Sequence, residues 1–365
     1  MPGLRLVPRE GVLDALRGVM AGDPPIAPMP DAEVEVARLV GALRPEEPVT
    51  EADAAVVVAT SGSTGTPRGV VLSREAIRAA VTATHARLGG PGTWVCPLPT
   101  HYVAGLMCLA RAVVAGTEPV VVSPGLDELP ALDAGTPAYI SVVPAQLYRV
   151  LGDRDLTEAM RRFDAVLVGG AAVAGDQLSA ARDAGIAVVT TYGMSETCGG
   201  VVYDGVPLDG VRVDVAAGGQ LSITSPTVFS GYRLDPEETR RVLDGRTFRT
   251  SDLGEWDRDR LVVRGRSDDV VVSGGVNVDL AALQRIVDAT CGPDVVAVLS
   301  VPHPRWGQQV VAVTTDDLTL EQVHERLEGL VGTGARPAEL RQVGELPRTS
   351  SGKIDRQAIA SGWER

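Results

Sequence analysis

The feature that most constrains the fold is an alternation of short apolar runs with amphipathic helical runs between residues 54 and 193. The apolar runs are AAVVVAT (54–60), TWVCPL (93–98), EPVVVS (118–123), AYISVVP (138–144), AVLVGG (165–170) and AVVTTYG (187–193). Runs of helical pattern separate several of them, such as SREAIRAAVTATHARL (73–88) and AGLMCLARAVVAG (104–116). Buried strands joined by helical connections predict α/β architecture, with parallel, doubly wound sheets covered on both faces.

The pattern changes twice further along the chain. From about residue 200, short strands with glycine turns indicate a β-rich part, as in GQLSITSPTVFSGY and RLVVRGR. From residue 269, strands and helices suggest a smaller α+β unit. We therefore predict a large N-terminal domain over 1–267 and a small C-terminal domain over 268–365.

Charge and cysteine usage exclude several classes of protein. The 365-residue chain carries a net charge of −13, which disfavours broad binding to nucleic acid or to anionic membranes. No stretch approaches the roughly 20 apolar residues that a membrane span needs. The four scattered cysteines form no CxxC pair. We therefore expect no zinc site or disulfide framework, and a reducing cytoplasm. The composition leaves a homo-oligomer open.

The loop TSGSTGTPRG (60–69) directly follows the first buried strand. Backbone N–H groups and hydroxyls in such a loop can surround a phosphate chain, and glycine permits the close approach. The spacing of a Walker A loop is not met. A flexible connection without function is the simpler alternative.

The same loop resembles the phosphate-binding signature of the adenylate-forming acyl-CoA synthetase superfamily. Arg68 stands where that superfamily usually has lysine, and a guanidinium can grip phosphate with two donors. The resemblance implies ATP-binding roles for Thr60, Ser61, Gly62, Ser63, Thr64, Gly65 and Arg68.

Further signatures follow in the order that the superfamily has them. TYGMSET (191–197) resembles its adenine and phosphate motif. The resemblance implies that Tyr192 lies against the adenine, that Gly193 belongs to the ATP site, that Ser195 contacts the α-phosphate and that Glu196 binds Mg²⁺. A carboxylate suits this hard cation, which prefers oxygen ligands.

Two motifs near the predicted domain boundary complete the nucleotide site. FRTSDLGEW (248–256) resembles the ribose motif, with Asp252 accepting from both hydroxyls and Ser251 in place of the usual glycine. GRSDDVVVSGGVNV (265–278) resembles the hinge motif. The resemblance implies that Arg266 reaches the ribose or the phosphates and that Asp268 is the pivot of a mobile small domain.

The only lysine of the chain is Lys353, in PRTSSGK (347–353), which resembles the superfamily's final catalytic loop. The implied first half-reaction joins a carboxylate to the α-phosphorus of ATP and releases pyrophosphate. Negative charge then develops on the carboxylate and phosphoryl oxygens, and a compact ammonium stabilises it where a broad guanidinium does not fit. A chance lysine on a solvated face is the alternative.

The second half-reaction transfers the acyl group to the thiol of CoA. The resemblance implies that the small domain turns about Asp268 and that Gly274, Gly275 and Trp306 then line the channel for the pantetheine arm of CoA. The simpler interpretation of Trp306 is a packing role.

The acid should bind among PTHYVAGL (99–106), SVVPAQLYRVL (141–151) and VGGAAV (168–173). His101 stands at the implied pocket mouth, and Gly169, Gly170 and Ala171 let a flat ring or the adenine of ATP lie against the backbone. Ser141 and Gln146 are candidates to hydrogen-bond a second polar group of the acid. A packed histidine and helix-cap or loop roles for Ser141 and Gln146 remain alternatives.

These segments are similar to those of actinobacterial o-succinylbenzoate–CoA ligases of menaquinone biosynthesis. The implied substrate is an aromatic dicarboxylic acid, activated at its succinyl carboxyl, with ATP, Mg²⁺ and CoA. The alternatives are a ligase for another acid, an adenylation enzyme that loads a carrier protein, a nucleotide-binding module without catalysis, and an ordinary ATPase that releases ADP.

Overall fold

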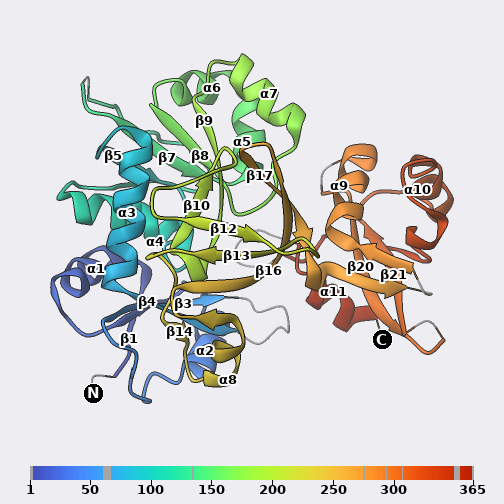
Figure 1. Cartoon of the computed structure of the whole chain (residues 1–365). Coiled ribbons are helices and arrows are strands. Elements are labelled where there is room, and N and C mark those ends of the chain that lie inside the picture. Colours follow the sequence, from blue (N-terminus) through green and yellow to red (C-terminus); the bar gives the residue numbers. More distant parts are fainter. Residues whose placement is uncertain are drawn as a thin grey trace. The chain divides into compact units, whose positions relative to one another are not determined.

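The structure, a computed structural model, describes residues 3–60, 67–133, 135–273, 276–292, 294–305, 307–348 and 354–363 (Figure 1). The chain divides into two compact units. The first runs from the N-terminal end to Asp214 and adds Ser222–Thr250 and Trp256–Val262. The second comprises Val215–Leu221, Ser251–Glu255 and the chain from Val263 onward. The mixture of sheets and helices confirms the α/β class.

The first unit contains a seven-stranded sheet with the strand order β11-β10-β9-β8-β7-β5-β6. Its strands are β5 (Thr93–Cys96), β6 (Val120–Val121), β7 (Ala138–Val142), β8 (Ala165–Val168), β9 (Val188–Met194), β10 (Gly199–Tyr203) and β11 (Val206–Pro207). Strands β5 to β9 pair in parallel, and β10 and β11 pair antiparallel. The parallel part is the one that the alternating pattern predicted.

Both faces of this sheet are buried, which explains the continuous apolar runs. Tyr139 and Leu167 belong to one core, whereas Ile140 and Val166, their neighbours in the chain, belong to another. Alternate side chains of a strand point to opposite faces, so each strand needs apolar residues at every position. The covering helices are α3 (Arg74–Leu88) and α4 (Val103–Ala115) for the first core, and α5 (Pro144–Leu151), α6 (Arg154–Met160) and α7 (Gly175–Asp183) for the second.

A second sheet of the first unit is mixed, and its antiparallel pairs differ from the parallel pairing that the sequence pattern predicted. Its order is β1 (Arg5–Val7), β2 (Ile26–Pro28), β3 (Ala54–Thr60), β4 (Arg68–Ser73) and β14 (Gly231–Tyr232). Strands β3 and β4 pair antiparallel, because residues 61–67 between them are too few for a parallel crossover. The helices next to its strands in the sequence are η1 (Arg9–Gly11), α1 (Val12–Ala21), α2 (Glu33–Leu43) and α8 (Pro236–Val242).

The β-rich part after residue 200 is confirmed as a further sheet. It contains β12 (Arg212–Val215), β13 (Gln220–Thr224), β15 (Leu243–Asp244), β16 (Thr247–Asp257) and β17 (Arg260–Arg266). The division between the two units falls within these strands. The domain boundary at residue 268 therefore stays a prediction.

The second unit has its own sheet, with helices after β19 and β21. Its elements are η3 (Ser267–Asp269), β18 (Val270–Ser273), β19 (Val276–Asp279), α9 (Leu280–Cys291), β20 (Val296–His303), β21 (Gly307–Thr314), α10 (Leu320–Arg326), η4 (Thr333–Ala335), β22 (Leu340–Gln342) and α11 (Arg356–Trp363). In β20, Val296 and Val298 pack into one core and Ala297 and Leu299 into another. Among the described helices of the whole chain, none is both long and apolar enough to cross a membrane.

Candidate active site

The base of the predicted phosphate loop is a strand pair of the first unit. Thr60 ends β3 and lies opposite Arg68, which begins β4. The hydroxyl of Thr60 donates to the carbonyl oxygen of Arg68 at 3.4 Å. Five predicted phosphate-binding residues lie outside the described residues, namely Ser61, Gly62, Ser63, Thr64 and Gly65. The hairpin brings the two ends of the loop together.

The side chain of Arg68 is held in place by two groups from another part of the chain. Its Nη1 donates to Oε1 of Glu238 at 3.2 Å, and its guanidinium carbon lies 5.4 Å from the ring centroid of Tyr232. Glu238 lies on α8, where Arg241 binds both of its carboxylate oxygens. Hydrogen bonding from Arg241, with the charges of Arg241 and Arg68, holds the pKa of Glu238 below its usual value. Glu238 is therefore a stable anion beside Arg68.

Ser195 and Glu196 are presented by a tight turn directly after β9. This turn is the short helix η2 (Ser195–Thr197), and Thr197 is fully buried in it. The Thr197 hydroxyl accepts from the backbone N–H of Met194 at 3.0 Å and donates to the carbonyl of Gly199 at 2.8 Å. The side chain of Thr197 therefore shapes the turn that carries both predicted site residues.

Replacing Thr197 by valine should destabilise the protein by about 1–3 kcal/mol, because the carbonyl of buried Gly199 loses its donor and the N–H of Met194 loses its acceptor. Valine has nearly the same shape, so the change tests the hydroxyl alone. Urea unfolding followed by circular dichroism measures the effect. Thr93→Val is the matched control, since Thr93 is half-buried on β5 and makes no side-chain hydrogen bond within the described residues. Equal stability of both variants would contradict the assignment.

Glu196 is hydrogen-bonded through its side chain to a tyrosine from β14. The phenol of Tyr232 donates to Oε1 of Glu196 at 2.8 Å. Burial and the Glu196 carboxylate raise the pKa of Tyr232 well above its usual value, so the phenol remains a donor. Tyr232 is 6% exposed and contacts Arg68 through its ring. It therefore touches the predicted phosphate-binding residue and the predicted metal ligand.

The carboxylate of Glu196 suits a magnesium ion that is also bound by the phosphates of a nucleotide. Within the described residues, no group of three or more His, Cys, Asp or Glu side chains could hold a metal by itself. Mg²⁺ is commonly bound by one or two carboxylates together with substrate phosphates. The single carboxylate of Glu196 after β9 fits that arrangement.

The predicted adenine wall lies at the ends of two neighbouring parallel strands. Gly169, Gly170 and Ala171 follow β8, and Tyr192 and Gly193 lie on β9. Gly170 has φ +79°, a conformation that favours glycine. A Cβ on Gly193 would lie 2.0 Å from the carbonyl oxygen of Gly199, so this position also requires glycine.

The three predicted acyl-pocket side chains have different surroundings. His101 has a buried Nε2 that lacks a hydrogen-bond partner in the described part of the chain, and burial lowers its pKa. Ser141 lies on β7 and is buried. The amide of Gln146 accepts from the N–H of Val143 and donates to the carbonyl of Pro124, which corresponds to the helix-cap alternative.

The structure adds Arg111, which sequence reasoning did not single out. Arg111 lies on α4, is 5% exposed and stacks over Trp94 at 4.5 Å from the ring centroid. It forms no ion pair with a described carboxylate, and its buried Nε lacks a hydrogen-bond partner there. The thiol of Cys108 lies beside it and beside Ser141. The sequence does contain a signal for Arg111, because a single arginine stands in the otherwise apolar helical run AGLMCLARAVVAG.

Three predicted residues meet within the second unit. Arg266 binds both carboxylate oxygens of Asp268 at 2.7 Å, and its Nη1 donates to Asp252 at 3.2 Å. Hydrogen bonding to Asp268 and the charges of Asp252 and Asp268 raise the pKa of Arg266 above its usual value. The predicted ribose ligand and the predicted hinge residue thus share one guanidinium.

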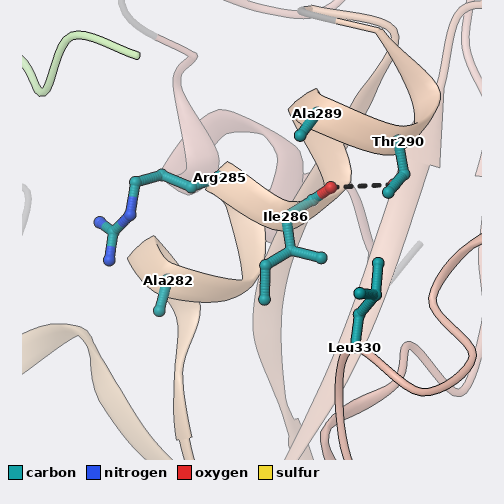
Figure 2. A pocket seen from close by; sticks show the side chains of 6 residues that line it. All are labelled: Ala282, Arg285, Ile286, Ala289, Thr290 and Leu330. Atoms are coloured by element: carbon teal, nitrogen blue, oxygen red, sulfur yellow. Dashed lines mark hydrogen bonds between the residues drawn. The ribbon is translucent and has the colours of Figure 1, made fainter. Parts of the chain in front are cut away.

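Several further predictions lie outside the described residues. They are the channel residues Gly274, Gly275 and Trp306, and the catalytic Lys353. A surface pocket of about 390 Å³ lies beside α9. Figure 2 shows the residues that line it, namely Ala282, Arg285, Ile286, Ala289, Thr290 and Leu330. Its lining is mostly apolar and includes none of the predicted site residues, so we do not assign the chemistry to it.

Comparison with known families agrees with the motif order. A family model described as AMP-binding enzyme matches residues 11–245, which is more than half of the chain. The model of the AMP-binding enzyme C-terminal domain matches residues 293–353.

Similar proteins cover nearly the whole chain. A probable 2-succinylbenzoate–CoA ligase of Mycobacterium tuberculosis is 42% identical over 95% of this chain and 94% of its own length. The 2-succinylbenzoate–CoA ligase of Enterococcus faecalis is 27% identical over 85% of this chain and 70% of its own length. The ATP-bound structure of MatB from Rhodopseudomonas palustris has a TM-score of 0.81 at 22% identity, covering 100% of this chain and 89% of that one. At this identity, the similarity to MatB shows a shared fold alone.

Proposed function

The chain belongs to the family of AMP-binding enzymes, and we propose that it is a 2-succinylbenzoate–CoA ligase that forms AMP. The observation that carries the proposal is the 42% identity to the mycobacterial relative over 95% of this chain. The order of motifs from the phosphate loop to Lys353 supports the same chemistry. A ligase for another acid, or one that loads a carrier protein, would share these motifs.

The first half-reaction forms an acyl-adenylate. One oxygen of the succinyl carboxylate attacks the α-phosphorus of ATP, and the bond from that phosphorus to pyrophosphate breaks. Arg68 and the loop before it would bind phosphate oxygens, and Ser195 would donate to the α-phosphate. When bound, Mg²⁺ supplies charge neutralisation to the phosphates, with Glu196 as its protein ligand.

The ammonium of Lys353 would lie where charge develops between the two reacting oxygens. The remaining nucleotide contacts in this proposal are those of Asp252 and Arg266 with the ribose, and of Tyr192 with the adenine. No general base is needed in this half-reaction, because the attacking carboxylate is already ionised at neutral pH.

The second half-reaction releases AMP. The sulfur of CoA attacks the acyl carbonyl carbon, the bond to AMP breaks, and the thiol proton goes to solvent. We propose that the domain from residue 268 turns about Asp268 between the two steps, and that Gly274, Gly275 and Trp306 line the pantetheine channel.

Arg111 supports an acid with two carboxylates. A buried cation without an anionic partner is costly, and a carboxylate from a ligand would compensate it with two parallel hydrogen bonds. 2-Succinylbenzoate keeps its ring carboxylate while its succinyl carboxylate reacts. We therefore propose that Arg111 recognises the ring carboxylate, with His101 and Ser141 in the same pocket.

The first test combines the protein with Mg-ATP, CoA and 2-succinylbenzoate, and follows AMP and the mass of the thioester. We expect AMP and 2-succinylbenzoyl-CoA in equal amounts, and neither without the acid. AMP or pyrophosphate without the thioester would indicate a carrier protein as acceptor. ADP would indicate an ATPase. Absence of AMP would contradict the choice of acid, and a panel of other carboxylic acids would follow.

We further propose that the protein acts in the cytoplasm in menaquinone biosynthesis. Its four cysteines are free thiols, which suits a reducing compartment. Its ligands in this proposal are small molecules, namely the acid, ATP and CoA. Assembly into a homo-oligomer remains a hypothesis that size-exclusion chromatography with light scattering would test.

A further inference from the structure

Tyr232 joins two groups that the proposed function assigns to one nucleotide. Its hydroxyl donates to Oε1 of Glu196 at 2.8 Å, and its ring faces the guanidinium of Arg68 at 5.4 Å. We propose that Tyr232 is a positioning residue for the magnesium nucleotide, orienting Glu196 through its hydroxyl and Arg68 through its ring. This inference rests on the proposed roles of Arg68 and Glu196.

The ring of Tyr232 is itself rigidly held. Its backbone pairs with Val70 on β4, and its N–H donates to the hydroxyl of Thr239 at 2.9 Å. Phe229 packs edge-on against the ring at a centroid distance of 4.9 Å. A side chain whose rotamer is restrained by packing can orient its neighbours.

The turn with Glu196 is anchored to the same region. The N–H of Phe229 donates to the backbone carbonyl of Glu196 at 2.8 Å, and η2 contacts β4. Phe229 therefore holds the backbone of Glu196 and packs on the tyrosine that holds its carboxylate. Main chain and side chain of Glu196 are both tied to the segment Phe229–Tyr232.

Arg68 receives a second restraint, which engages Nη1 alone among the side-chain donors that bind described residues. Glu238 accepts from Nη1, and Arg241 in turn holds Glu238. The guanidinium carbon of Arg68 lies over the Tyr232 ring at 5.4 Å from its centroid, a contact that does not require a hydrogen bond from an N–H group. Lysine, which the superfamily usually has here, would place a compact ammonium over the ring in place of the planar guanidinium.

Tyr232→Phe separates the two contacts, because phenylalanine keeps the ring and removes only the hydroxyl. The readout is the dissociation constant of ATP, measured by titration calorimetry without acid or CoA, once in EDTA and once with excess Mg²⁺. We expect the variant to bind ATP in EDTA like the unaltered protein. Its gain in affinity from Mg²⁺ should fall by about tenfold or more, the usual effect of removing a group that orients a metal ligand.

The matched control is Tyr148→Phe, which removes the hydroxyl of a side chain that is 65% exposed on α5. It should leave both dissociation constants unchanged. A Tyr232→Phe protein with an undiminished magnesium effect would overturn the inference, as would an unaltered protein that gains no affinity from Mg²⁺. Equal weakening of ATP binding with and without Mg²⁺ would show that Tyr232 acts only through packing. This result would also overturn the inference.

Tyr232→Leu tests the ring contact. It should weaken ATP binding in EDTA as well, since Arg68 then loses the ring that supports it. If this variant does not fold, Tyr232→Phe still decides the matter. The calorimetric readout needs neither acid nor thiol, so a wrong substrate would show up only as absent AMP formation in the unaltered protein.

Discussion

Lys353→Ala is expected to lower the rate of acyl-adenylate formation by about 10²–10³-fold, the usual cost of removing one group that stabilises developing charge in a transition state. Binding of ATP should change little, because the ammonium acts on charge that appears only during the reaction. Pyrophosphate release in single-turnover experiments measures the first effect, and titration calorimetry with ATP measures the second.

Lys353→Arg gives a second test of this prediction at the only lysine of the chain. Lys353→Arg keeps the charge but replaces a compact ammonium by a planar fork. We expect it to be nearly as slow as Lys353→Ala, since the guanidinium does not fit between two reacting oxygens. Near-normal pyrophosphate release by Lys353→Ala would rule out the catalytic assignment.

Arg111→Met is expected to lower kcat/KM for 2-succinylbenzoate by about 30-fold or more, corresponding to the 2–5 kcal/mol typical of a buried charge pair that loses one partner. The ring carboxylate would then enter a pocket without its cation. The KM for ATP should not change. Measuring AMP formation over a range of acid concentrations tests the prediction.

The comparison acid is 4-oxo-4-phenylbutanoate, which lacks the ring carboxylate and keeps the reacting one. Because this acid has no partner for Arg111, the Arg111→Met variant should use it about as well as the unaltered protein does. Equal losses with both acids would show that Arg111 supports the fold and does not select the substrate.

Stability gives an independent check on Arg111. Replacing a buried charge without an ion partner by an apolar side chain of similar volume is often neutral or stabilising. We therefore expect the Arg111→Met variant to melt at the same temperature or higher, while its activity falls. A residue kept for function at a cost in stability shows this combination.

Much of the fold was accessible from the sequence because it depends on local pattern. The parallel strands β5 to β9 are buried on both faces, and such strands read as continuous apolar runs. The helix α3 begins where Ser73 caps it, with the Ser73 hydroxyl accepting from the N–H of Ala76 at 3.0 Å. The strands β1 and β2 give no such pattern, because each has only three residues and a neighbouring proline.

Only part of the candidate site could be predicted from the sequence, because sequence patterns are local. Motifs such as TYGMSET are contiguous, so the resemblance by itself assigns roles to Ser195 and Glu196. Tyr232 and Glu238 lie more than 160 residues from Arg68 in the chain, and their contact arises because β14 pairs with β4. No local pattern encodes such a pairing.

The sequence by itself determined the α/β class, the family and the identity of the lone lysine, since these follow from periodicity and from contiguous motifs. Only the tertiary structure decided that Tyr232 connects Arg68 to Glu196, and that Arg111 is a buried cation without an ion partner among the described residues. The physical reason is that burial and long-range contact depend on how distant segments pack, whereas periodicity and motifs depend on neighbours along the chain.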